Sequence, residues 1–457
     1  MLRSLQMKDV GPAAQLDLEL GERLNVLTGD NGLGKSFVLE VAWWVATGTW
    51  VGRPVLPHRG KEDDAVISFQ LDPGSPNGPR QPSLWHGQPQ SARFRRKRQD
   101  WQDPLRHGTN YRGDGEGLWT PEWLNQLDWT PVVYSQADGA FSVWDPARNY
   151  PIQSPSESIY VDPRPYHLRL DELWDGLALD GKRVCNGLIQ DWGRWWLEDA
   201  ADKPSPFGLL RDVLRKLSHP SEPMEPGEPR RIYLDDSRDF PTIDLPYGNV
   251  PVSHLSAGMK RIVSLAYLIA WAWTEHVKAC ELLGRKPAER VVFLMDEVES
   301  HLHPKWQRHI LPRLLEVLAG LGPSLRPQLL VTTHSPMVLA SLEPHWITAN
   351  DKLFLFELEE RATEPSRKEV ELDELPWVKY GDAVGWLTSP IFGLKQARSP
   401  EAEVAIRAAQ DFMTGKLADL PEGLRTAQEI DRELRRLLPD QDKFWPRWVV
   451  WQEREGK

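Results

Sequence analysis

Short apolar runs that end beside a glycine, an acidic pair or a histidine are the clearest pattern along this chain. Residues 24–28 read Leu-Asn-Val-Leu-Thr, residues 290–295 read Arg-Val-Val-Phe-Leu-Met, and residues 328–333 read Gln-Leu-Leu-Val-Thr-Thr. Strands that are covered on both faces of a parallel sheet show continuous apolar runs of this kind. The pattern therefore predicts an α/β core built on a buried parallel sheet.

Helices are expected in other parts of the chain. Residues 37–44 follow the first strand and read as a helix, and a long apolar helix is expected to open near residue 257. Apolar residues at helical spacing over 188–197 indicate an amphipathic helix. Two more helices are expected over 400–415 and 423–437, because Ser-Pro and Pro-Glu-Gly supply start signals there.

The segment between the first strand and its helix carries a phosphate-binding pattern. It reads Gly-Asp-Asn-Gly-Leu-Gly-Lys-Ser, which is G-x-x-x-x-G-K-[ST] with a strand before it and a helix after it. Glycines let backbone N–H groups wrap phosphates, and the helix N-terminus favours negative charge. Lys35 is expected to reach the β- and γ-phosphates, and Ser36 to hold Mg²⁺. The candidate nucleotide-binding residues of this loop are Gly29, Asn31, Gly32, Gly34, Lys35 and Ser36.

Two acids end the second apolar strand, and a histidine follows the third. Asp296 and Glu297 would lie at the carboxyl edge of the sheet, where such sheets bind ligands. Asp296 is expected to bind Mg²⁺, partly through water, and Glu297 to polarise the attacking water. His334 is a candidate for contacts with the γ-phosphate and with that water. Lys35, Glu297 and His334 are thus the candidate catalytic residues.

A Ser-Ala-Gly sequence opens the long apolar helix. Ser256 and Gly258 at a helix start can form an anion-binding cap. Such a cap suits the γ-phosphate of a second subunit, and a plain helix cap is the alternative interpretation.

Composition excludes several classes of protein. Lys and Arg number 55 against 66 Asp and Glu, so the net charge of −11 argues against a surface that binds nucleic acid everywhere. Two cysteines, Cys185 and Cys280, provide neither a disulfide framework nor a zinc ligand set. The N-terminus lacks a signal core, and the most apolar run, 262–273, is shorter than the roughly 20 residues that span a bilayer. We therefore expect a cytoplasmic protein without a membrane partner. The 22 tryptophans are expected mostly as core and interface filler.

In this order the motifs resemble those of the ABC ATPase superfamily. Residues 29–36 resemble its Walker A, residues 255–259 (Leu-Ser-Ala-Gly-Met) its signature, residues 291–297 its Walker B, residues 299–304 its D-loop, and His334 its switch histidine. The resemblance implies ATP and Mg²⁺ as cofactors. It also implies a head-to-tail homodimer, or a larger homo-oligomer, in which Ser256 and Gly258 act on the nucleotide of the partner. The family's Mg²⁺-sensing glutamine has Gln136 as its candidate, with an unrelated surface glutamine as the alternative.

The D-loop sequence Glu-Ser-His-Leu-His-Pro is similar to that of the soluble branch of the superfamily, which holds RecF-like, SMC-like and OLD-like ATPases and ATPases of bacterial anti-phage systems. The first functional hypothesis is an ATP-gated sensor or scaffold of an anti-phage complex, which hydrolyses ATP slowly and controls a separate nuclease or other toxic effector. The second is a RecF-like DNA-repair ATPase. The third is a binding module that uses ATP as structural glue with negligible turnover.

The segments outside the motifs bear on which further parts the protein contains. No long heptad pattern follows Walker A, which argues against SMC-type arms, and no nuclease motif is recognisable in this chain. Residues 93–98 (Arg-Phe-Arg-Arg-Lys-Arg) could follow a nucleic acid backbone with Phe94 or Trp101 stacking on bases, and a solvated face is the alternative.

The predicted fold is an ABC-type P-loop core with a globular insert between Walker A and the signature, and with a helical C-terminal extension. Four regions are expected: an ATPase lobe with Walker A and a strand-rich part over 1–150, a mostly helical insert with a Pro-rich linker over 151–250, a second ATPase lobe over 251–350, and a largely helical extension over 351–457.

Overall fold

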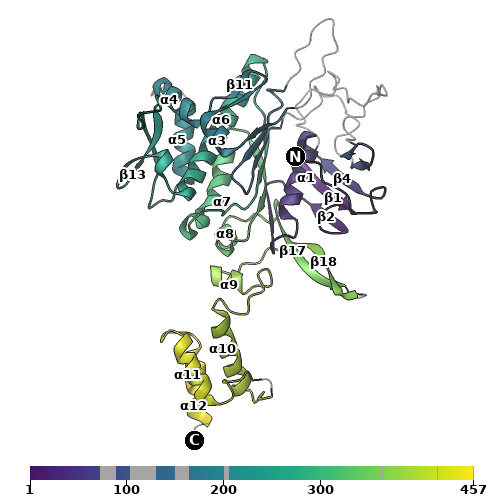
Figure 1. Ribbon diagram of the computed structural model, residues 1–457, viewed down its shortest axis with the longest axis vertical. Coiled ribbons are helices and arrows are strands. Elements are labelled where there is room, and N and C mark those ends of the chain that lie inside the picture. The colour runs from purple at the N-terminus through teal and green to yellow at the C-terminus, as the bar shows by residue number, and fades with distance from the viewer. Residues whose placement is uncertain are drawn as a thin grey trace. The chain divides into compact units, whose positions relative to one another are not determined.

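A mixed sheet with the strand order β18-β17-β3-β16-β15-β7-β8-β9 runs through the larger part of the chain (Figure 1). Its central strands pair in parallel, and they are β17 (Asp351–Arg361), β3 (Leu24–Gly29), β16 (Arg326–Thr332), β15 (Arg290–Met295) and β7 (Val132–Ser135). Antiparallel strands form the edges, namely β18 (Glu364–Leu375) on one side and β8 (Phe141–Trp144) with β9 (Tyr166–Leu168) on the other. Strand β15 is buried along its whole length. The buried parallel sheet expected from the apolar runs is therefore confirmed.

The computed structural model describes residues 1–72, 89–102, 130–149, 164–199, 205–361, 364–418 and 420–455. The chain divides into two compact units, Met1–Lys379 and Tyr380–Lys457. The first unit contains all the motifs singled out in the sequence.

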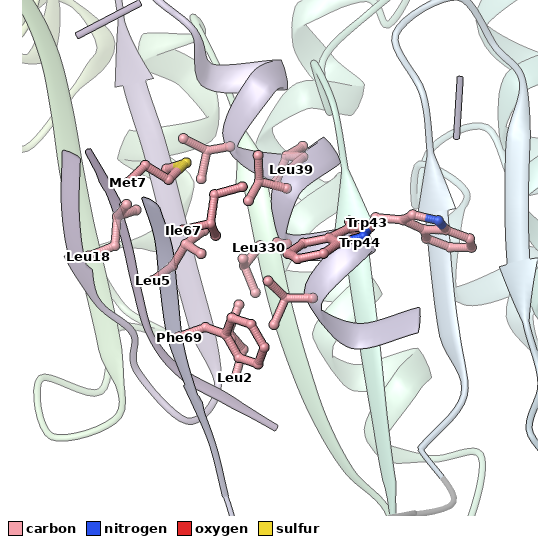
Figure 2. Close-up of a cluster of buried hydrophobic side chains, with 14 of the residues drawn as sticks. Leu2, Leu5, Met7, Leu18, Leu39, Trp43, Trp44, Ile67, Phe69 and Leu330 are labelled. Carbon is pink, nitrogen blue, oxygen red and sulfur yellow. The ribbon is translucent and has the colours of Figure 1, made fainter. Parts of the chain in front are cut away.

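A second, antiparallel sheet lies on one side of the central sheet, with helix α1 (Lys35–Thr47) between them (Figure 1). Its strand order is β2 (Gln15–Glu19), β1 (Leu2–Lys8), β4 (Val66–Leu71), β5 (Gln90–Arg95) and β6 (Asp100–Trp101). Figure 2 shows Leu39, Trp43 and Trp44 of α1 in the cluster that joins the two sheets. Leu5 and Phe69 contribute from the second sheet. Because α1 packs against both sheets, its position is set by this core, and with it the position of the phosphate loop at the start of the helix.

Helices cover the opposite face of the central sheet (Figure 1). They are α3 (Leu170–Asp175), α4 (Leu188–Glu198), α5 (Pro206–Leu217), α6 (Ala257–Leu282), α7 (Pro304–Ala319) and α8 (Pro336–Leu342). Helix α6 is the long apolar helix predicted from residue 257, and α4 matches the amphipathic helix predicted over 188–197.

The described part of the insert contains more strand than the sequence predicted. Besides β9 it holds the hairpin β10 (Leu177–Leu179) and β11 (Lys182–Cys185), and a small sheet of β12 (Glu225–Arg230), β13 (Phe240–Leu245) and β14 (Gly248–Pro251). Strand β12 overlaps residues 218–229, the Pro- and Glu-rich segment expected to be a linker. It tolerates Pro226 and Pro229 because it is an edge strand with an irregular register between Gly227 and Arg230.

Residues 351–375 also differ from the largely helical extension expected from residue 351. They form β17 and β18, and β17 pairs in parallel with β3, with Asp351 opposite Leu24 and Phe356 opposite Gly29. The buried run Leu-Phe-Leu-Phe over 353–356 belongs to a strand covered on both faces.

The second unit is helical, with α9 (Ala383–Leu387), α10 (Pro400–Met413), α11 (Ala427–Leu437) and α12 (Trp445–Glu455). Helices α10 and α11 match the two predicted from the start signals, with Ser399 and Thr426 as their N-caps. They share a small core around Ile406, Ile430 and Trp448. Among the described residues, no helix is long and apolar enough to cross a membrane.

The first prediction concerns the core between the two sheets. Leu330 on β16 is 0% exposed, whereas Leu234 is 98% exposed. We expect Leu330→Ala to lower the free energy of unfolding of the first unit by about 2–5 kcal/mol, because it removes buried methyl groups and leaves a cavity. The same truncation in Leu234→Ala should stay within about 0.5 kcal/mol of the wild type. Urea denaturation of both variants measures this difference, and equal midpoints would contradict the assigned core.

Candidate functional site

The phosphate loop adopts backbone angles that require glycine. Gly29 has a φ of 123° and Gly34 a φ of 101°, in the region that other residues rarely adopt. A Cβ on Gly29 would lie 2.1 Å from the carbonyl oxygen of Phe356, and one on Gly34 would lie 2.3 Å from Cγ of Pro12. Strand β17 and the turn between β1 and β2 thus approach the loop so closely that neither position has room for a side chain.

The loop presents its polar groups at the start of α1. Gly34 is the N-cap, and no side chain caps the helix, so its first N–H groups have no side-chain acceptor. Asn31, Gly32 and Ser36 are exposed. Such an open helix start is a ready anion-binding site. The backbone geometry therefore fits the phosphates of a nucleotide.

The Lys35 ammonium lies at the mouth of this loop. Its Nζ donates to the carbonyl oxygens of Gly29 at 2.9 Å and Asp30 at 2.6 Å. Burial lowers the pKa of Lys35, and the nearby carboxylates, Asp296 foremost, oppose that shift. An ammonium has three donor hydrogens, and these bonds use two.

The two acids after β15 are held in different ways. Asp296 is buried, its N–H donates to the carbonyl of Ser135 at 2.9 Å, and its Oδ1 accepts from the Thr332 hydroxyl at 2.5 Å. Glu297 is half-buried with a φ of 48°, and its N–H donates to Oγ1 of Thr332 at 2.7 Å. Both acids therefore lie at the carboxyl edge of the central sheet, beside the phosphate loop, as predicted.

The switch histidine is tied to the D-loop. The Glu299 carboxylate accepts from the N–H of His334 at 2.6 Å and from the Thr333 hydroxyl at 2.8 Å. Burial lowers the pKa of the half-buried His334 imidazole, and the charge of Lys35 lowers it further. A lowered pKa favours the neutral form of the imidazole.

Gln136 lies at the expected strand end, but its side chain is engaged elsewhere. It follows β7, whose Ser135 pairs with Met295, so Gln136 is next to Asp296 along the sheet edge. Its Nε2 donates to Oγ of Ser142 at 3.2 Å, and its backbone closes the tight turn into β8. A role of Gln136 in sensing Mg²⁺ remains a proposal.

Ser256 and Gly258 open α6 as predicted. Ser256 is exposed and caps the helix by accepting from the N–H of Met259 at 3.3 Å. A Cβ on Gly258 would lie 2.7 Å from the carbonyl oxygen of His301, so the signature packs on the D-loop of its own chain. Among the described residues, no hydrogen bond or ion pair joins Ser256 to the phosphate loop.

Arg261 is a site residue that the sequence analysis missed. It lies one turn into α6, and its Nη2 approaches the backbone carbonyl of Asp296 at 3.5 Å. Burial lowers the pKa of Arg261, and Glu297 and Asp296 oppose the shift. The signal in the sequence was the Lys260-Arg261 pair just before the apolar stretch of this helix.

The structure corrects part of the interpretation of residues 93–98. Trp101 is buried and its Nε1 donates to the carbonyl of Val55 at 2.8 Å, so it is not free to stack on a base. Arg95 pairs with Asp100, and Arg96 with Glu62, which offsets part of the positive charge. Trp101 was misread because its role as a core residue depends on the contact with the distant Val55.

Comparisons with known proteins give one family match and several similarities over parts of the chain. Residues 182–340 match the family described as "AAA domain, putative AbiEii toxin, Type IV TA system". The chain is 37% identical over 65 residues to the Retron Ec83 probable ATPase of Escherichia coli, which covers 14% of this chain and 11% of that protein. It is 30% identical over 140 residues to the Septu protein PtuA of Bacillus mycoides (strain KBAB4), covering 31% of this chain and 16% of that one. Septu protein PtuA of Bacillus thuringiensis is 29% identical over 113 residues, 24% of each chain. The chain thus spans less than a quarter of the length of each of these relatives.

Solved structures give distant matches. The SMC head domain from Thermotoga maritima is 14% identical with a TM-score of 0.34, covering 82% of this chain and 99% of that one. The recombination mediator RecF bound to ATPrS is 13% identical with a TM-score of 0.31, covering 78% and 95%. The order of the motifs and their placement on the parallel sheet resemble those of ABC-type P-loop ATPases, and the family match covers residues 182–340, about a third of the chain.

The second prediction tests the rigid phosphate loop. In Gly29→Ala the new methyl group would collide with the backbone of Phe356. Residue 29 would also have to keep a φ of 123°, which alanine rarely adopts. We expect the affinity for ATP to fall more than about tenfold, which is ~1.4 kcal/mol of binding free energy. Gly181→Ala is the matched control, because Gly181 also has a positive φ, of 73°, but open space around it in the turn between β10 and β11. That variant should lose about 1–2 kcal/mol of stability and keep its ATP affinity. Calorimetric titration with ATP measures both, and equal affinities would contradict the fit.

Proposed function

We propose that this chain binds ATP and Mg²⁺, closes on the nucleotide as a head-to-tail homodimer, and hydrolyses ATP slowly. One observation carries the proposal. The pairing of β3 and β15 with β16 brings the phosphate loop with Lys35 and the two acids Asp296 and Glu297 to the same edge of the sheet.

The residues fit the steps of phosphoryl transfer. Lys35 and the N–H groups of the loop would bind the phosphates, and Ser36 with Asp296 would hold Mg²⁺. When bound, Mg²⁺ neutralises phosphate charge and orients the γ-phosphate. Glu297 would orient the attacking water and accept its proton. A neutral His334 can hydrogen-bond the γ-phosphate or the water without adding a charge.

The exposed signature at residues 255–259 supports the proposal that a second copy of the chain closes on the bound nucleotide. Ser256 is exposed at the N-terminus of α6, and the helix dipole there favours an anion. Within one chain this site makes no hydrogen bond to the phosphate loop in the described residues. A second copy of the chain would therefore supply the γ-phosphate that Ser256 and Gly258 bind.

The biological setting we propose is an anti-phage complex. The similarities to the Retron Ec83 probable ATPase and to Septu protein PtuA support this, as does the family match. In this proposal the ATP state of the dimer controls a separate effector, a nuclease or another toxic protein. Effector control and slow turnover remain parts of the proposal.

A RecF-like DNA-binding ATPase is the alternative. Arg93 and Lys97 are exposed and would supply phosphate contacts. This alternative predicts ATP-dependent DNA binding by the chain alone that weakens steeply with salt. A third possibility is a binding module that holds ATP without hydrolysing it. The position of Glu297 argues against this possibility, because a module without turnover needs no general base.

The third prediction tests closure. Glu297→Gln keeps the side-chain size but removes the base, so ATP should bind without being consumed. We expect mass photometry with ATP and Mg²⁺ to show this variant at twice the 52.3 kDa of one chain, or at a higher multiple, and as a monomer without ATP. Glu281→Gln, an identical change at an exposed position of α6, should behave as the wild type. A mass that ATP does not change would reject action of the signature in trans.

The fourth prediction tests effector control. The tagged Glu297→Gln chain, purified together with the products of its neighbouring genes, should retain a partner protein when ATP and Mg²⁺ are present. Lys35→Ala should retain much less of it, because it loses the phosphate contact. If neither variant retains a neighbour, and the chain alone binds DNA with strong salt dependence, the RecF-like alternative replaces the defence proposal.

A further inference from the structure

A single buried hydroxyl connects the two acids of the candidate site. Thr332 is the last residue of β16, and it is 0% exposed. Its Oγ1 donates to Oδ1 of Asp296 at 2.5 Å and accepts from the N–H of Glu297 at 2.7 Å. A hydroxyl has one donor hydrogen and two acceptor lone pairs, so one atom can serve both neighbours at once.

We propose that Thr332 is a positioning residue that sets the Mg²⁺-binding acid and the water-orienting acid in fixed relation to each other. The inference deepens the proposed ATP hydrolysis and rests on it. Thr332 is buried, and it acts on the nucleotide and on the water only through its hydrogen bonds to Asp296 and Glu297.

The backbone of Glu297 shows why it needs support. A non-glycine residue at a φ of 48° lies in the left-handed region, which costs about 1–2 kcal/mol. Thr332 holds this conformation from two atoms, because its Oγ1 accepts from the N–H of Glu297 and its carbonyl accepts from the N–H of Val298 at 3.2 Å. Without the hydroxyl, one of the two hydrogen bonds from Thr332 to this turn is lost.

The carboxylate of Asp296 is oriented by the same group. In the described part of the chain, Thr332 is the side chain that hydrogen-bonds this carboxylate, and it does so through Oδ1. A carboxylate fixed in this way loses less side-chain freedom when it binds a cation. Partners that orient a metal ligand typically change metal affinity or activity by about 10–100-fold when they are removed.

The neighbouring Thr333 has a different partner, so the proposed positioning role belongs to Thr332 alone of the two. The Thr333 hydroxyl donates to Glu299 at 2.8 Å and so ties the switch strand to the D-loop. Of these two neighbouring threonines, Thr332 hydrogen-bonds to Asp296 and Glu297, and Thr333 hydrogen-bonds to Glu299 instead.

The test compares Thr332→Val, Thr332→Ser and Thr242→Val. Valine keeps the shape of threonine without the hydroxyl, and serine keeps the hydroxyl. Thr242 is also 0% exposed, and its hydroxyl donates to the carbonyl of Glu228 at 2.9 Å in the small sheet of the insert. It controls for the loss of a buried hydroxyl as such.

Three quantities are measured for each purified full-length chain: ATP affinity without Mg²⁺, the Mg²⁺ concentration that gives half-maximal binding of a fluorescent ATP analogue, and the turnover number. We expect Thr332→Val to raise the Mg²⁺ requirement and lower turnover, each by about 10–100-fold, with ATP affinity in the absence of Mg²⁺ unchanged. Thr332→Ser should lie near the wild type. Thr242→Val should lose thermal stability without a change in the Mg²⁺ requirement.

Other outcomes overturn the inference. An unchanged Mg²⁺ requirement in Thr332→Val would do so, and so would the same shift in Thr242→Val, which would show a general loss of stability. The Mg²⁺ titration of binding does not depend on turnover. A wild-type chain that binds ATP and Mg²⁺ but hydrolyses nothing would therefore reject the proposed hydrolysis while the role of Thr332 toward Asp296 is still decided.

Discussion

The parallel register of β3, β16, β15 and β7 is the constraint on which the candidate site depends. Leu27 pairs with Thr332, Val331 with Met295, and Met295 with Ser135. Parallel strands end at one edge, so this register brings the phosphate loop, the two acids and the switch histidine together from positions up to 305 residues apart (29 to 334). A shift of one residue in any pair would turn the relevant side chains to the other face of the sheet.

The charges at this edge explain why Mg²⁺ belongs in the proposal. Lys35 and Arg261 are cations whose pKa burial lowers, and both sense the carboxylates of Asp296, Glu297 and Glu299. Three carboxylates against two cations leave the edge negative, and ATP would add further negative charge. The half-buried Glu40 on α1 also shows the excess of negative charge, because burial and the charge of Asp296 both raise its pKa. A divalent cation relieves this repulsion, and a positioned carboxylate such as Asp296 is a ligand that Mg²⁺ prefers.

The sequence was sufficient for the parts of the site that depend on local pattern. The phosphate loop, the acids after β15, His334 and the cap at Ser256 were all placed correctly, because each needs only a strand or helix end and a residue type. It was insufficient where a side chain meets a distant residue. The pairing of Thr332 with Asp296 depends on register, the bond of Gln136 to Ser142 on a tight hairpin, and the burial of Trp101 on the loop at Val55. Strands β17 and β18 were missed because the apolar run of residues 353–356 is short and is followed by many acidic residues, which disfavour a strand.

The contacts around the D-loop give the proposed dimer a physical basis for communication between its two sites. His334 and Thr333 bond to Glu299 at the start of the D-loop, and the carbonyl of His301 within the same loop packs against Gly258 of the signature. A shift of His334 toward a γ-phosphate would therefore act on Glu299 through this hydrogen bond, and the close contact of His301 with Gly258 links the D-loop to the start of α6. In a head-to-tail dimer that helix start faces the nucleotide of the partner. In the proposed dimer, loss of the γ-phosphate at one site would be transmitted through these packed contacts to the nucleotide that the partner holds.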